Sequence, residues 1–281
     1  MAILIYIIII TIFIFGLIAG SFLNCVIYRM ELKYRGEVTS PLRGRSYCPH
    51  CKHKLSWQDL IPVFSFLILR GKCRYCGKRI SWQYPLVEIA TALLFLLIFN
   101  FQFSIFNKFS IFNFQTLFNL CFLFIVSCFL IVIFVYDLKH YIIPDRVIYP
   151  AIIIALIFNF QFLIFNLQFS IFNELILSAF GAALFFLLIV LLSRGKWMGI
   201  GDIKLAFFMG LFLGSPNILV ALFLAFLIGA IIGVGLILAK RKTLKSEVPF
   251  GPFLVTGTFI VLFWGQKIIQ WYLNLFKISN F

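Results

Sequence analysis

The chain has 281 residues, of which 63% are hydrophobic, and its mean hydropathy is +1.08. Water-soluble globular domains are only about half apolar, so this composition argues against one. The net charge of +15 would suit a nucleic-acid-binding protein, but the 24 Lys and Arg residues are clustered: 12 lie in 29–79, with 2, 3 and 4 more in 137–146, 194–204 and 240–245. If these four segments share one side of a membrane, that side is cytoplasmic. The charge then reflects topology and contact with membrane lipids, and no nucleic-acid partner is expected.

Long uncharged stretches predict an all-α polytopic membrane protein. A helix needs about 20 apolar residues to cross the hydrocarbon core, and a spanning backbone must satisfy its own hydrogen bonds. Keeping the basic segments on one side requires about eight transmembrane helices. We predict spans at 3–27, 85–106, 117–136, 146–164, 175–193, 205–239 (crossing twice around a turn at 214–217) and 252–272.

These spans divide the chain into three parts. Residues 1–27 form a first transmembrane helix, which we expect to be retained because no basic segment precedes it and no clear cleavage site follows it. Residues 28–84 form a small cytoplasmic insert, and residues 85–281 form the main membrane domain. Phe/Asn-rich repeats at 98–115 and 157–173 are interpreted as expanded loop sequence at the ends of spans.

The insert carries two C-x2-C pairs, Cys48/Cys51 and Cys73/Cys76, separated by 21 residues. This spacing is typical of a tetrahedral zinc site with four thiolate ligands. A 57-residue insert has little core of its own, so a bound metal would contribute to its folding. Two disulfides are the alternative, but they require an oxidising compartment. His50 and His53 are alternative ligands, although four sulfurs are favoured, and four protein ligands make the zinc structural.

Three of the four aspartates, Asp137, Asp145 and Asp202, lie at predicted cytoplasmic membrane edges. Carboxylates near hydrocarbon are costly, which makes them functional candidates. The structural alternative is that each caps a helix or pairs with a lysine, and this fits Asp145 best. Asp137 ends a span, where a negative charge opposes the helix dipole. Asp202 lies in Gly199-Ile200-Gly201-Asp202, where the glycines permit close approach and unusual backbone angles.

A pair formed by Asp137 and Asp202 would have the chemistry of a carboxylate dyad. Two adjacent carboxyls cannot both ionise cheaply, so one keeps a proton. The ionised carboxylate would activate a water molecule, and the protonated one would donate to the scissile carbonyl. From the residues alone, the catalytic and structural readings of this pair are equally supported.

The chain resembles the bacterial prepilin peptidase family of Gly-x-Gly-Asp aspartic peptidases. The resemblance extends in order from about residue 20 to 254, and only the Phe/Asn-rich segments depart from it. The matching stretches are GSFLN at 20–24, YR at 28–29, RSYCPHC at 45–51, LIP at 60–62, RGKCRYCG at 70–77, YPLVE at 84–88, Asp137 with IPD at 143–145, GIGDIKL at 199–205 and PFGPF at 249–253.

This resemblance implies an eight-span enzyme of the bacterial inner membrane. It implies cleavage of leader peptides after a glycine in type IV prepilins and pseudopilins, the substrates that supply pili or type II secretion. Asp137 and Asp202 are then the catalytic pair, with Asp145, Gly199, Gly201 and Lys204 in supporting roles.

Family members with the cysteine insert usually also methylate the new N-terminus with S-adenosylmethionine. Gly71 and Lys72 match a position tied to that activity, and Glu88 either belongs to that site or is a polar partner of the insert. The sequence contains no glycine-rich methyl-donor fingerprint. Two alternatives remain: a peptidase without methyltransferase activity, and a non-enzymatic, zinc-stabilised membrane subunit of a pilus or secretion assembly.

Overall fold

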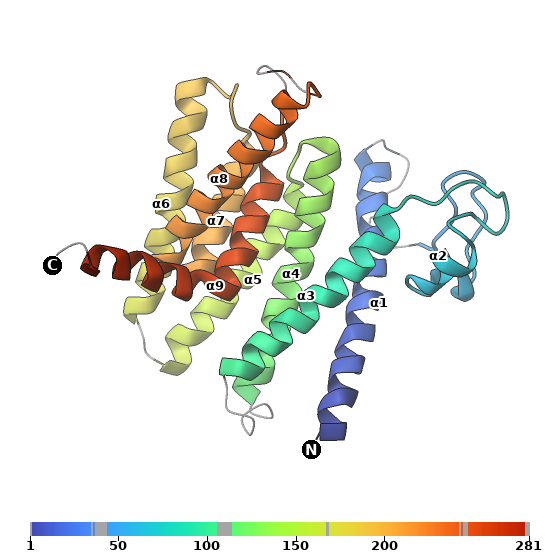
Figure 1. The fold of residues 1–281 in the computed structure, drawn as a ribbon, viewed down its shortest axis with the longest axis horizontal. Helices are drawn as coiled ribbons and strands as arrows, with labels where there is room; N and C mark the ends of the chain where they lie inside the picture. The colour runs from blue at the N-terminus through green and yellow to red at the C-terminus, as the bar shows by residue number, and fades with distance from the viewer. Residues whose placement is uncertain are drawn as a thin grey trace. The chain divides into compact units, whose positions relative to one another are not determined.

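A computed structural model describes residues 2–34, 36, 44–105, 114–166, 169–241, 243 and 247–278. Helices dominate these residues, and the only β structure among them is two isolated bridges in the cysteine insert. Figure 1 shows the helices. In chain order they are α1 (Ala2–Tyr34), the 3-10 helix η1 (Trp57–Leu60), α2 (Phe64–Ile68), α3 (Gln83–Ile105), α4 (Phe114–His140), α5 (Asp145–Asn166), α6 (Phe169–Ser193), α7 (Ile200–Leu213), α8 (Asn217–Leu238) and α9 (Gly251–Ile278).

Each predicted span coincides with a helix, which confirms the all-α membrane architecture. Within the described residues, six helices are long and apolar enough to cross a bilayer: α1, α3, α4, α6, α8 and α9. The other two predicted crossings correspond to α5 and α7. Helix α7 has 14 residues and is about 21 Å long at 1.5 Å per residue, which is shorter than a typical hydrocarbon core. The predicted turn at 214–217 does separate α7 from α8.

Several helix ends differ from the prediction. Helix α1 continues to Tyr34 instead of ending at residue 27, and α4 continues to His140, so Asp137 lies three residues inside its end. The interpretation of the Phe/Asn-rich repeats as loops is wrong for their described parts, which lie within α3, α4, α5 and α6. Residues 106–113 and 167–168 of these repeats lie outside the described residues. The position of a helix end depends on local capping and packing contacts, and a hydropathy pattern contains no information about those contacts.

The helices form two compact units, Met1–Val132 and Ile133–Phe281. In the first unit, α1 packs closely on α3 because Gly16 leaves room for the other backbone. A Cβ atom at Gly16 would lie 2.5 Å from the Cα atom of Ala92. Small residues commonly permit such approach between membrane helices. At the insert end, the buried Asn24 amide donates to the carbonyl of Tyr84 over 3.0 Å, which fixes α1 beside the start of α3.

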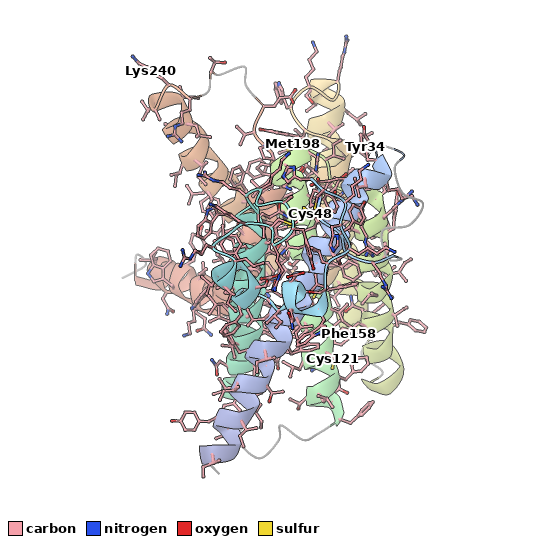
Figure 2. All side chains as sticks on the ribbon, turned by 90° about the vertical axis from the view of Figure 1, so that its right-hand side faces the viewer. Tyr34, Cys48, Cys121, Phe158, Met198 and Lys240 are labelled. Carbon is pink, nitrogen blue, oxygen red and sulfur yellow. The ribbon has the colours of Figure 1, made fainter. Side chains whose placement is uncertain are left out.

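In the second unit, α7 occupies the centre and contacts α5, α6, α8 and α9. The side chains of Leu205, Phe208, Met209 and Leu211 are fully buried. Figure 2 shows Met198, before α7, and Lys240, after α8, toward the same end of this unit, with Phe158 of α5 toward the other end. The start of α7, directly after Met198, therefore lies toward the same end of this unit as Lys240.

Candidate active site and metal centre

Asp137 lies in the last turn of α4 and is only 4% exposed. Its Oδ2 atom accepts a hydrogen bond of 2.9 Å from the backbone N–H of Gly251, the first residue of α9. The first N–H groups of a helix have no partner within it, and they carry the positive end of the helix dipole. Helix α9 therefore stabilises a carboxylate whose position is unfavourable within α4 itself.

Gly251 contacts the candidate site, and the sequence analysis did not single it out. A Cβ atom there would lie 2.6 Å from Oδ2 of Asp137, and real Cβ atoms essentially never approach another heavy atom so closely. Any larger residue would push the Asp137 carboxylate away from its donor. The available signal was a glycine between two prolines, Pro249-Phe250-Gly251-Pro252, at the start of a helix, where proline is tolerated.

Asp202 is the third residue of α7 and is 8% exposed. Its Oδ2 atom accepts the backbone N–H of Gly199 over 3.1 Å, so it occupies the reciprocal position of a helix capping box. The Asp137 carboxyl lies near enough to act on the charge of Asp202, although burial and the Gly199 hydrogen bond act more strongly. The fold therefore brings together two buried carboxyls from helices that are distant in sequence.

The two glycines before Asp202 act mainly through space. The expectation of unusual backbone angles is wrong at Gly199, where φ is −85° and ψ is 159°, an extended conformation open to any residue. Close approach is confirmed at Gly201: a Cβ atom there would lie 3.0 Å from Cβ of Ile143. Gly201 thus lets the start of α7 pack against the segment between α4 and α5.

Asp145 and Lys204 form an ion pair at the edge of this region. The Nζ atom of Lys204 lies 2.6 Å from Oδ1 of Asp145 and 4.8 Å from the ring centroid of Tyr149. The Asp145 side chain is 59% exposed, unlike the two buried carboxyls. Of the structural alternatives considered for Asp145, pairing with a lysine is the one observed. The pair connects the starts of α5 and α7, and Lys204 lies two residues after the buried Asp202.

The four insert cysteines form one cluster, in which the Sγ atoms of Cys48, Cys51, Cys73 and Cys76 all lie within 4.8 Å of one another. Such a cluster could hold a metal ion, and four thiolates match the tetrahedral preference of zinc. His53, considered as a substitute ligand, instead stacks on Tyr75 with ring centroids 3.8 Å apart. Within the described residues, the cluster contains only sulfur donors.

The two cysteine pairs lie on two hairpins with the same hydrogen bonds. In the first, Cys48 N–H donates to His53 O, and Lys52 N–H donates to Cys48 O. In the second, Cys73 N–H donates to Lys78 O, and Gly77 N–H donates to Cys73 O. Bridges Tyr47–Lys54 and Lys72–Arg79 close the two hairpins. The two hairpins therefore have the same hydrogen-bonded turn, and each places its two cysteine sulfurs in the four-sulfur cluster.

Asp59 has a structural role in the insert. It accepts hydrogen bonds from Arg74 Nε at 2.8 Å, the Tyr75 hydroxyl at 3.0 Å, and Ser56. Partial burial acts to raise the pKa of Asp59, but hydrogen bonds from Ser56, Tyr75 and Arg74 outweigh it, so the pKa lies below its ordinary value of 3.8. The carboxylate therefore joins η1 to the second cysteine hairpin.

The residues associated with methylation lie in two places in the first unit. Gly71 adopts φ of +67° at the start of the second hairpin, and Lys72 beside it is exposed. Glu88 is buried in α3, where Oε2 accepts the backbone N–H of Val63 over 2.8 Å and the carboxylate also bonds to Ser21. Glu88 thus contacts the segment between η1 and α2, which makes it a polar partner of the insert.

Two protein-family models match the chain. The Bacterial Peptidase A24 N-terminal domain matches residues 14–101, which include residues 14–34 of α1, the insert and most of α3. The Type IV leader peptidase family matches residues 123–234, which include Asp137 and Asp202. The two matches therefore cover the cysteine cluster and the buried carboxyl pair separately.

Several curated proteins are similar over almost the whole chain, and each of the following is named prepilin leader peptidase/N-methyltransferase. The protein from Aeromonas hydrophila is 30% identical, with 94% of this chain and 93% of the relative aligned. The protein from Legionella pneumophila is 32% identical, with 92% of each aligned. The protein from Bacillus subtilis (strain 168) is 33% identical, with 94% and 97% aligned. No solved structure matches the chain significantly.

Proposed function

This chain belongs to the type IV leader peptidase family, and on that basis we propose that it is a membrane-embedded aspartic endopeptidase that removes leader peptides from prepilins and pseudopilins. The observation that carries the proposal is the pair Asp137 and Asp202, two buried carboxyls that each accept a backbone N–H. Gly201, beside Asp202, packs against Ile143, six residues after Asp137. The names of the relatives supply the substrate class. Cleavage would follow a glycine at the cytoplasmic face of the inner membrane, where the basic segments are expected.

The mechanism follows from two carboxyls in one buried site. Like charges in a poorly solvated place cannot both persist, so the pair holds one proton. The ionised carboxylate takes a proton from water as the water oxygen attacks the scissile carbonyl carbon, and the protonated carboxyl donates to the carbonyl oxygen. The Gly251 and Gly199 amides each bond to Oδ2 of one carboxyl and so orient the two groups.

We assign residues 85–281 to this membrane peptidase domain and residues 28–84 to a zinc-binding insert. Four thiolates leave no position for water, so the zinc would stabilise the insert and take no part in hydrolysis. Asp145, Gly199, Gly201 and Lys204 support the pair by fixing the starts of α5 and α7.

A second activity, N-methylation of the new N-terminus, is proposed from the names of the relatives. S-adenosylmethionine would supply the methyl group. We associate Gly71 and Lys72 with this activity because they match the family position tied to it, and Lys72 is exposed on the second cysteine hairpin. Glu88 would contribute indirectly, by holding the insert against α3.

The intact mass of a model prepilin coexpressed with this protein tests both activities. The expected product lacks its leader and carries one added methyl group. A cleaved but unmethylated product would support the peptidase alone. An unprocessed prepilin, with the protein present and folded in the membrane, would favour the non-enzymatic alternative of a membrane subunit in a pilus or secretion assembly.

A further inference from the structure

The insert exposes an apolar stripe that its own core does not use. Six large apolar side chains between residues 57 and 68 are 39% to 75% exposed. Contiguous apolar surface on a segment outside the spans usually marks an interaction site. The stripe consists of Trp57, Leu60, Ile61, Phe64, Leu67 and Ile68.

Two short helices and the turn between them carry these residues. Trp57 and Leu60 lie three residues apart in η1, which is one repeat of a 3-10 helix. Phe64, Leu67 and Ile68 have the three- and four-residue spacing of one face of α2, and Ile61 lies in the turn between the two helices. Phe66 points the other way, because it is buried and contacts the Trp82 ring with centroids 4.9 Å apart. The segment thus has an inner face that packs on the insert and an outer face without protein cover.

A hydrogen bond holds this segment against the first turns of α3. The N–H of Val63, between η1 and α2, donates to Glu88. Glu88 is the sixth residue of α3, about 7.5 Å along the helix axis from Gln83 at 1.5 Å per residue, and lies within the candidate span Gln83–Phe103. Its neighbours Leu86 and Ile89 are exposed, as lipid-facing residues would be.

The surroundings of the stripe have the composition of a membrane interface. Trp82, just before α3, is exposed, and tryptophan is enriched at the level of lipid head groups. Arg70 and Lys72 follow α2 directly and are exposed, with Arg79 opposite Lys72 in the hairpin. Basic side chains next to an apolar face match an anionic membrane surface.

We propose that the 57–68 stripe inserts shallowly into the phospholipid bilayer and docks the cysteine insert on the membrane surface. Its apolar side chains enter the boundary between head groups and acyl chains, and Arg70 and Lys72 contact anionic head groups. The insert would then be held by three attachments: α1, α3 and the bilayer itself.

Quenching of tryptophan fluorescence by brominated acyl chains tests this docking. The full-length protein, with Trp82, Trp197, Trp264 and Trp271 changed to Phe, keeps Trp57 as its only tryptophan. It is reconstituted into phosphatidylcholine/phosphatidylglycerol vesicles with or without bromine on the acyl chains. The matched control adds Trp57→Phe and Gln58→Trp, which moves the indole one position, off the stripe.

We expect the Trp57 emission to be quenched at least twofold more strongly than the emission of the control. Equal quenching would overturn the proposal, as would a Trp57 indole that is quenched only by a water-soluble quencher. If the tryptophan-depleted protein fails to fold, a photo-crosslinking benzoylphenylalanine at Phe64 in the otherwise native chain replaces it. A lipid adduct there, but not with the same group at Gln58, supports docking; adducts only with protein would refute it.

Discussion

The backbone N–H of Gly251 donates to Oδ2 of Asp137, a residue 114 positions earlier in the chain. The bond joins the last turn of α4 to the first turn of α9 and gives a buried carboxylate a fixed donor. Because a Cβ atom at Gly251 would overlap this oxygen, the position of the proposed catalytic group depends on a residue without a side chain.

Gly251→Ala is therefore expected to reduce the cleavage rate by about 100-fold, because displacing a reacting group by about 1 Å commonly costs that much. The measurement is kcat on a model prepilin in detergent or vesicles. The matched control is Gly233→Ala in α8, where a Cβ atom meets nothing within 4 Å. Equal kcat for the two variants would show that the Asp137 contact does not matter for turnover.

Asp137→Asn and Asp202→Asn are each expected to lower cleavage by about 10³-fold or more, since general acid or base catalysis is lost while the fold is kept. The measurement is the fraction of prepilin cleaved over time. Glu174→Gln is the control, because this exposed acidic residue of α6 has no part in the proposed site. Normal processing by either dyad variant would refute the assignment.

Metal analysis of the purified protein is expected to find about one zinc per chain, bound by four thiolates. Cys48→Ser and Cys73→Ser should each remove it and lower the thermal stability of the insert, because metal binding contributes to folding. Cys121→Ser, in the exposed part of α4 and outside the cluster, should keep the metal. A metal-free wild-type protein with a folded insert would rule the site out.

Lys72→Gln is expected to leave cleavage unchanged and to lower methylation, so that the mature pilin is lighter by one methylene. Intact-mass spectrometry measures both activities in one sample. Lys78→Gln removes an equally exposed charge from the same hairpin and serves as the control. Loss of methylation in both variants would show that the positive charge of the hairpin matters and not Lys72 in particular. Unchanged methylation in both would remove Lys72 from the proposal.

Asp59→Asn is expected to weaken the insert by about 1 kcal/mol or less at pH 7, because part of the network is solvent-screened. The pKa of Asp59 lies below 3.8 in the folded protein, so its stabilisation is complete above that value and is lost as the pH falls through the folded pKa. The thermal midpoint of the insert should therefore differ between variant and wild type at pH 7, and the two midpoints should converge as the pH falls below the folded pKa of Asp59. A constant difference across this range would contradict the ionic role.

The membrane helices and the cysteine cluster could be predicted from the sequence because both signals are local. An uncharged run of helical length identifies a span wherever it packs, and two C-x2-C pairs carry their own turns. The hydrogen bonds within each cysteine hairpin connect residues four or five positions apart, so neighbouring residues determine them.

Other features depended on contacts between distant helices. The hydropathy of a sequence does not show which helices contact one another. The Gly251–Asp137 hydrogen bond joins residues 114 positions apart, and the Lys204–Asp145 ion pair joins residues 59 positions apart, so neither could be predicted from the sequence. Packing also extended α1 to Tyr34 and α4 to His140. The sequence by itself determined the spans, the cluster of basic charge and the paired thiols. Only the tertiary structure decided which groups surround each carboxylate and which apolar face of the insert stays uncovered, because both depend on how separate helices pack.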